Sequence, residues 1–143
     1  MSDIPLFLTV RQSFDRPRVG DLTAAVRGEL EAVLPGRSIG ADARVGVAVG
    51  SRGIRDIATV VRAAIDFLKG RGARPFILPA MGSHGGATAD GQRQLIAHYG
   101  VTEEAMGCPV QAEMETRSLG RTASGVEVRV AENGKVNLPL IGE

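Results

Sequence analysis

The apolar positions of the chain fall into short continuous runs and longer segments with helical spacing. The first run, Leu6–Val10, predicts a short strand. Asp21 is suited to cap a helix, because the apolar residues after it recur every three or four positions until Pro35 and Gly36 end the pattern. These apolar residues are Leu22, Ala25, Val26, Leu30, Val33 and Leu34. The segment therefore predicts an amphipathic helix with one buried stripe.

Two further apolar runs each end in a glycine-rich loop. Val45–Val49 and Pro75–Pro79 are continuous runs of the kind found in strands that are covered on both faces, as parallel strands are. The loops that follow them are Gly50–Gly53 and Gly82–Gly86. A helical stripe between the two runs consists of Ile54, Ile57, Ala58, Val61, Ala64, Ile65 and Leu68. A third helix is expected after Thr88, a good capping residue. Its apolar positions are Leu95, Ile96 and Tyr99.

The order strand, glycine loop, helix, strand, glycine loop, helix is typical of βαβ units. It predicts an α/β fold, a layered Rossmann-like domain with a mainly parallel sheet. The segments Val110–Glu115, Arg117–Gly120 and Val126–Val130 alternate in polarity instead, and Ser124–Gly125 is a plausible hairpin turn. We therefore expect a small antiparallel β extension near the C-terminus. Residues 1–143 are expected to form a single domain, since one core usually serves about 100 to 200 residues.

The composition excludes several classes of protein. Hydrophobic residues make up 43% and charged residues 23%, which is typical of a globular domain. The net charge is +1, the basic residues are scattered and aromatic residues make up 3%, so neither nucleic acid nor a membrane surface is an expected partner. The segment Met1–Pro5 lacks the basic residues of a signal peptide. The single cysteine, Cys108, excludes an internal disulfide and favours a reducing compartment, so the cytoplasm is the expected location.

Arg52 is the candidate residue for binding an anion. It lies between Ser51 and Gly53, at the carboxyl end of a predicted parallel strand, where ligands of open α/β sheets bind. A guanidinium beside a helix start is suited to hold a carboxylate or phosphate, with help from backbone N–H groups. The alternative is a solvated surface charge in a glycine turn.

His84 is the candidate general acid or base. Histidine changes its charge near neutral pH, and the glycines around His84 would let a substrate approach closely. The alternative is a loop histidine that only ties down the turn. Ser51 and Ser83 are candidates for binding the substrate or an anion, or for capping helices. His98, in the last turn of a predicted helix, is expected only to complement the helix dipole.

Other residue patterns give little evidence for cofactor binding, catalysis or metal binding. Neither glycine loop matches a dinucleotide or P-loop motif. Ser83 beside His84 does not indicate a catalytic triad, because adjacent side chains rarely point at each other. Two histidines and one cysteine do not supply a complete zinc or nickel site, so no metal ligands are predicted. Cys108 is expected to be a buried, small apolar group.

Two long segments carry a family resemblance. They are VAVGSRGIRDIATVVRAAIDFL, Val47–Leu68, and FILPAMGSHGGATADGQRQLIAHYGVTEEAMG, Phe76–Gly107. Together they resemble the N-terminal domain of the nickel-dependent lactate racemase family, and in particular a divergent branch whose members mostly have unassigned substrates. The resemblance extends roughly over Leu6–Val130, which is nearly the whole chain.

The resemblance implies a racemase or epimerase that acts on a 2-hydroxy acid. In such enzymes a nickel ion sits in a pincer cofactor that derives from nicotinic acid and is linked to a lysine. One histidine removes the hydroxyl proton of the substrate while hydride moves to the cofactor, and a second histidine serves the opposite face. His84 matches one of these histidines, and Arg52 matches the arginine that grips the substrate carboxylate. Val49 and Gly85 stand where the racemases have an acidic residue and an arginine.

The resemblance also implies an incomplete enzyme. Family enzymes are well over twice as long, and their cofactor lysine, metal-binding histidine and second catalytic histidine lie in the later part. Lys135 belongs to no motif that would make it the cofactor lysine. The chain is therefore expected to be a fragment, a split subunit or a degenerate copy, with a second polypeptide or domain as partner. Two alternatives remain: a non-catalytic module that binds a small carboxylate or phosphate, and a structural remnant that needs a partner to cover its sheet.

Overall fold

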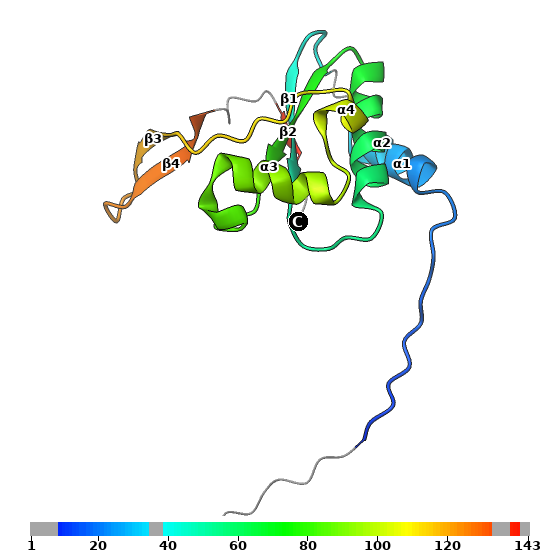
Figure 1. The fold of residues 1–143 in the computed structure, drawn as a ribbon. Coiled ribbons are helices and arrows are strands. Elements are labelled where there is room, and N and C mark those ends of the chain that lie inside the picture. Colours follow the sequence, from blue (N-terminus) through cyan, green and yellow to red (C-terminus); the bar gives the residue numbers. More distant parts are fainter. Residues whose placement is uncertain (1–8, 35–38, 133–137, 141–143) are drawn as a thin grey trace, which may run out of the picture.

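The computed structural model describes residues 9–34, 39–132 and 138–140. Its elements, in chain order, are α1 (Leu22–Val33), β1 (Arg44–Val49), α2 (Ile57–Gly70), β2 (Arg74–Pro79), the 3₁₀ turn η1 (Gly85–Ala87), α3 (Ala89–His98), α4 (Glu103–Met106), β3 (Thr116–Arg121), β4 (Glu127–Ala131) and β5 (Leu138–Leu140). Figure 1 shows the parallel strands in the middle, with α1 and α2 on one side and the β3–β4 hairpin projecting from the other. The fold is α/β, as the sequence predicts.

Strand β1 lies at the centre of the parallel sheet. It pairs with β2 along its whole length, Val45 opposite Pro75 and Val49 opposite Pro79, and with β5 on its other edge. Most of β1 and β2 is buried, which confirms the interpretation of both apolar runs as strands covered on two faces. Because the two strands are parallel and in register, they end at the same level, and the two glycine-rich loops leave the same edge of the sheet.

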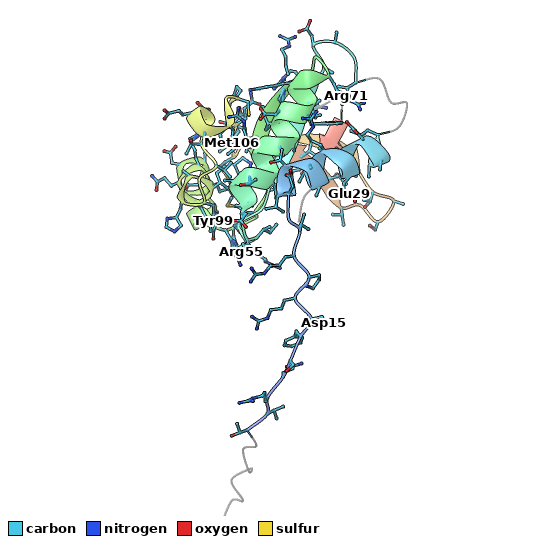
Figure 2. All side chains as sticks on the ribbon, turned by 90° about the vertical axis from the view of Figure 1, so that its right-hand side faces the viewer. Asp15, Glu29, Arg55, Arg71, Tyr99 and Met106 are labelled. Carbon is cyan, nitrogen blue, oxygen red and sulfur yellow. The ribbon has the colours of Figure 1, made fainter. Side chains whose placement is uncertain are left out.

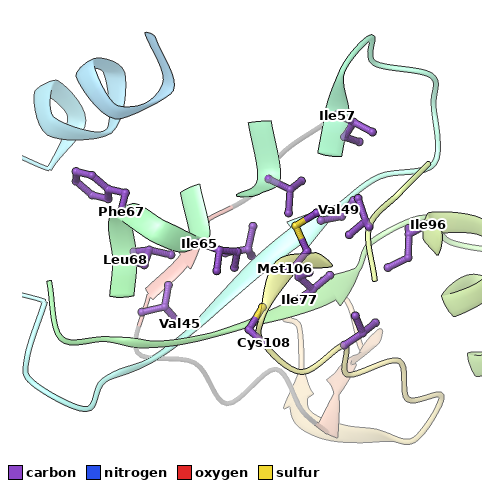
Figure 3. Packing of buried hydrophobic residues seen from close by; sticks show 14 of the residues in the cluster. Val45, Val49, Ile57, Ile65, Phe67, Leu68, Ile77, Ile96, Met106 and Cys108 are labelled. Atoms are coloured by element: carbon purple, nitrogen blue, oxygen red, sulfur yellow. The ribbon is translucent and has the colours of Figure 1, made fainter. Parts of the chain in front are cut away.

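Helix α2 supplies much of the core. Its buried residues are Ile57, Val61, Ala63, Ile65, Phe67 and Leu68. Figure 3 shows Ile65 and Leu68 packed beside Val45 and Ile77 of the sheet. A fully buried side chain of this size contributes about 1.5 to 3 kcal/mol, so the packing of α2 on the sheet stabilises the fold substantially. The prediction for Ile54 is wrong: its side chain is 52% exposed, because the helix begins only at residue 57.

Helix α1 begins where the sequence predicts but packs less deeply than expected. The Oδ1 atom of Asp21 accepts a hydrogen bond from the backbone N–H of Ala24 at 2.9 Å, which confirms the cap. The helix packs against α2, so only part of its stripe reaches the core. Leu34, just past the helix end, is buried and Leu30 is partly buried. Val33 is 69% exposed, and its prediction as a core residue is therefore wrong.

The predicted first strand, Leu6–Val10, is not confirmed. Residues 6–8 lie outside the described residues, and residues 9 and 10 belong to no strand. In Figure 1 the described part of this segment runs away from the domain as an extended arm that leads to α1. Val10 is 80% exposed there, so it does not contribute to the core.

The C-terminal part differs from the prediction in three places. Strand β5, which pairs in parallel with β1, was not predicted. Helix α4 was not predicted, because four residues are too few to show a periodic pattern. Val110–Glu115 was predicted as a strand, but only Val110 forms a β-bridge, to Ile77 of β2. The antiparallel pair β3–β4 is present, and Gly125, with φ +83°, lies in its turn as expected.

Candidate functional site

A side-chain contact joins the two glycine-rich loops. The Oγ atom of Ser51, two residues after the end of β1, forms a hydrogen bond with Nδ1 of His84, five residues after the end of β2. The backbone pairing also continues one step beyond the strands, because the N–H of Ala80 donates to the carbonyl of Val49 at 2.9 Å. The loops thus meet at the carboxyl edge of the sheet, the edge where ligands of α/β proteins bind.

His84 is held by its backbone and exposed at its ring. Its N–H donates to the carbonyl of Met81 at 3.2 Å, and its own carbonyl accepts from the N–H of Ala87 at 3.3 Å. The side chain is exposed to solvent. Within the described residues Nδ1 has Ser51 as its partner, whereas Nε2 has no hydrogen bond. An imidazole with one nitrogen anchored and the other open to solvent has the geometry that proton transfer to a bound substrate requires.

Gly85 is required by the packing of the loop against α3. Its φ is +65°, and a Cβ atom at this position would lie 2.5 Å from the backbone N of Gln92. The converse also holds, because a Cβ atom on Gly91 would lie 1.8 Å from the carbonyl oxygen of Gly85. A larger residue after the histidine would not fit this backbone. Gly85 is therefore part of a tightly closed loop.

Arg52 follows the bridging serine directly and presents a free cation. Its side chain is exposed, and within the described residues its guanidinium has no hydrogen bond or ion pair. The neighbouring Arg55 differs, because it pairs with Asp56 at 3.5 Å. The carbonyl of Arg52 accepts from the N–H of Ile54 at 2.7 Å, which closes the turn. A guanidinium that no protein carboxylate neutralises is available to an external anion.

Helix α3 and its C-cap residue hold both loops through side-chain hydrogen bonds. The Oη atom of Tyr99 donates to the carbonyl of Ser51 at 3.1 Å, and Nε2 of Gln92 donates to the carbonyl of Gly82 at 2.8 Å. Gln92 is 6% exposed, which makes its amide a buried polar group satisfied by the loop. Thr88 caps the helix, as predicted, by accepting from the N–H of Gly91 at 3.1 Å. Figure 2 places Tyr99 at the end of the domain from which the arm departs.

The pairing of Ser51 with His84 was not predicted, although both residues were candidates. The sequence predicts that both loops follow neighbouring parallel strands, and β1 and β2 are such neighbours, but it does not give their register. Given that register, the partner of His84 can be sought in the other loop. Ser83, the adjacent serine, has an exposed side chain whose hydroxyl makes no hydrogen bond within the described residues. Its role as a ligand for substrate stays a prediction.

A cavity of about 370 Å³ lies at the opposite end of the sheet, where β1 and β2 begin. Its cations are Arg44, Lys69 and Arg74, and each already has a protein partner. Arg44 lies over the ring of Phe76 at 5.0 Å, and Lys69 donates to the carbonyl of Gly107 at 2.6 Å. Arg74 forms an ion pair with a nearby aspartate. Because these cations already contact other groups of the protein, this cavity is a weaker candidate for an anion site than the loop of Arg52.

The remaining candidates have structural surroundings. Cys108 is buried, as predicted, and burial raises the pKa of its thiol, while nearby Lys69 acts in the opposite direction. His98 is the last residue of α3 and lies edge-on to Tyr99, with ring centroids 5.8 Å apart. No group of three or more histidine, cysteine or acidic side chains in the described part of the chain could hold a metal ion. Lys135 lies outside the described residues.

Comparisons with known proteins complete the description of the site. Neither protein-family models, nor curated proteins, nor solved structures gave a match to this chain. Among the described residues, no helix combines the length and the apolar character needed to cross a membrane.

Proposed function

We propose that this chain binds a small 2-hydroxy carboxylate between its two glycine-rich loops and exchanges a proton with the substrate hydroxyl through His84. The hydrogen bond between Ser51 and His84 carries the proposal, because it joins the loop of His84, the candidate base, to the loop of Arg52, the candidate residue for binding the carboxylate. In this assignment Arg52 binds the carboxylate as a two-pronged donor. His84 then takes or returns the hydroxyl proton at its open ring nitrogen.

We propose further that the domain is a layered Rossmann-like unit of a racemase or epimerase of the lactate racemase type. The support is the sequence resemblance, together with the placement of both matched residues beside the same sheet edge. If His84 takes the hydroxyl proton, inversion at C2 requires the C2 hydrogen to leave as hydride, and a nickel-pincer cofactor would supply the hydride acceptor. The described residues do not fit that cofactor, since they offer no cluster of metal ligands. A second domain or polypeptide would have to hold it.

A second candidate function is a module that binds small anions without chemistry. The guanidinium of Arg52, exposed and unpaired within the described residues, supports it, because a free cation attracts carboxylates and phosphates alike. The two functions differ in whether the hydroxyl group of the ligand is recognised. A base that takes a hydroxyl proton must contact that hydroxyl, whereas an anion module has no such requirement.

Titration calorimetry with lactate, propionate and inorganic phosphate separates the two functions, because propionate lacks only the hydroxyl of lactate. The acid-base function predicts that lactate binds about tenfold more tightly than propionate, the effect of one good hydrogen bond. His84→Ala should abolish this preference, and Arg52→Gln should weaken both carboxylates. Arg93→Gln is the control, because Arg93 is paired with Asp90 on α3. Equal binding of lactate and propionate by the unaltered chain would refute the acid-base function and support the anion module.

A turnover assay tests the racemase proposal in an enzyme completed by its second domain. His84→Ala should lower turnover by about 10² to 10⁴, the usual contribution of a positioned proton-transfer group. Unchanged turnover would contradict the role of His84.

A further inference from the structure

The two ring nitrogens of His84 have different surroundings. Nδ1 is in hydrogen-bond contact with Oγ of Ser51, and Nε2 has no partner within the described residues. A neutral imidazole carries one proton, so one nitrogen donates and the other accepts. The partner at Nδ1 therefore decides whether the open nitrogen, Nε2, presents a lone pair or an N–H group.

Two arrangements of the Ser51–His84 hydrogen bond are chemically distinct. If the serine hydroxyl donates to Nδ1, the ring proton is on Nε2, and the open nitrogen cannot accept a proton. If Nδ1–H donates to Oγ, Nε2 keeps its lone pair and is a base. The second arrangement also persists after Nε2 gains a proton, because both nitrogens of an imidazolium are donors. Only this arrangement suits both charge states of an acid-base cycle.

We infer that Ser51 is a positioning residue for His84: its Oγ accepts the Nδ1–H of the imidazole and thereby keeps Nε2 available as the base. This inference rests on the proposed function for the direction of the hydrogen bond. It assigns Ser51 to the histidine rather than to the substrate. In the proton step the substrate O–H bond breaks, an Nε2–H bond forms, and the electron pair stays on the substrate oxygen. The reverse step returns the proton.

The backbone of Ser51 is fixed in a way that suits this role. Its carbonyl accepts from Oη of Tyr99, a side chain that packs against the core. The loop of His84 is fixed to the same helix, since the buried amide of Gln92 donates to the carbonyl of Gly82. Gln92 lies in α3 and Tyr99 directly follows it, so hydrogen bonds from this helix and its C-cap hold both loops of the Ser51–His84 contact. A serine hydroxyl on a fixed backbone can be aimed at one ring nitrogen, because only its χ1 rotation remains.

Nitrogen NMR of the imidazole ring tests the assignment directly. Long-range ¹H–¹⁵N correlation spectra would be recorded on the ¹⁵N-labelled chain at about pH 8.5, two units above the usual histidine pKa. We expect the His84 spectrum to show a protonated Nδ1 and an unprotonated Nε2. Ser51→Ala should shift the population toward the Nε2–H form, and Ser51→Thr, which keeps the hydroxyl, should restore the original spectrum. Ser83→Ala is the matched control, with no expected change of tautomer.

The outcomes separate this inference from the proposed function. An unaltered chain that carries the proton on Nε2, or a Ser51→Ala variant that keeps it on Nδ1, would overturn the positioning role whether or not lactate binds. The spectra can also agree with the inference while calorimetry shows no preference for lactate over propionate. That result would leave Ser51 as the positioning residue and refute the acid-base function. Amide spectra of each variant report whether it is folded. If Ser51→Ala fails to fold, Ser51→Cys replaces it, and a Cys variant that keeps the unaltered tautomer distribution overturns the role.

Discussion

Individual residues of the His84 loop adopt conformations that side chains ordinarily avoid. Gly82, Gly85, Gly86 and Ala87 all have positive φ angles. For Ala87, with φ +53°, this costs about 1 to 2 kcal/mol. Its N–H is bonded to the carbonyls of both Ser83 and His84, which offsets part of that cost. Such a loop is preorganised, because its conformation is fixed before any ligand arrives.

The first prediction is that Gly85→Ala destabilises the domain more than Gly82→Ala. Both glycines have positive φ, so each variant should lose about 1 kcal/mol from backbone strain. Only the Cβ of Gly85→Ala meets other atoms, at 2.5 Å from the backbone of Gly91 and Gln92, whereas a Cβ at Gly82 has nothing within 4 Å. Gly85→Ala should therefore cost at least about 2 kcal/mol more, the effect of overpacking. Urea unfolding measures the free energy of unfolding of both variants, and equal losses would show that the His84 loop does not pack on α3 as described.

At the residue scale, the sequence indicates which groups are reactive but not that Ser51 meets His84. Arg52 and His84 stand out because each lies in a glycine-rich loop after an apolar run. The contact of Ser51 with His84 depends on strand register and on loops that extend two and five residues past the strand ends. Register is set by the packing of whole elements, so a single sequence does not reveal it.

Helix α3 has the largest role in holding the site among the elements described. It carries the capping Thr88 at its start and Gln92 on its buried face, and Tyr99 lies directly after its end. These three side chains contact the His84 loop or the carbonyl of Ser51. The helix is short and only moderately apolar, so its buried polar contacts matter for its position as well as for the loops.

The second prediction concerns Gln92→Met on this helix. Methionine matches glutamine in length and removes the donor, which leaves the carbonyl of Gly82 without its partner. An orphaned buried acceptor costs about 1 to 3 kcal/mol, and the variant should lose stability by this amount. Amide hydrogen exchange should also become faster in the loop 82–87. Gln94→Met is the control, because Gln94 is exposed on the same helix and should change stability by less than about 0.5 kcal/mol. Similar effects of both variants would contradict the supporting role of α3.

At the element scale, long periodic segments were predictable and short ones were not. α2, β1 and β2 lie close to where the sequence places them, because each contributes several buried positions, whereas the three-residue strand β5 was not predicted. α4 has only four residues, and the segment 110–115 pairs with β2 through a single β-bridge, so neither carries a pattern long enough to predict. For α1 the pattern gives the correct cap at Asp21 but overstates burial. Periodicity reports which face is apolar, and how deeply that face packs depends on the neighbouring helix.

Two described segments lie outside the compact part of the molecule, the arm that leads to α1 and the β3–β4 hairpin (Figure 1). Exposed apolar side chains occur on both, with Phe14 64% exposed on the arm and Val126 62% exposed on the hairpin. The core built from α2 and the parallel sheet is therefore only part of the molecule.

The last prediction is that the hairpin can be removed without unfolding the core. All of β3 and most of β4 is exposed, and an isolated two-stranded hairpin is at best marginally stable. Its ends are adjacent, because the N–H of Glu132 donates to the carbonyl of Glu115 at 2.9 Å. Residues 116–131 can thus be replaced by an Asn-Gly turn. The free energy of unfolding, measured with urea, should then change by no more than about 1 kcal/mol, since no core side chain is lost.

The comparison for this deletion is Ile65→Val, a change of one methylene group at a residue that is 0% exposed. That variant should cost about 0.5 to 1.5 kcal/mol, although it alters far less of the chain. A shortened chain that loses more stability than Ile65→Val would mean that the hairpin packs on the core. A shortened chain that keeps both its stability and its binding of lactate would place the fold and the site together in the α/β core. In that case the hairpin would be free to serve contacts with another polypeptide, because neither folding nor ligand binding would constrain its exposed side chains.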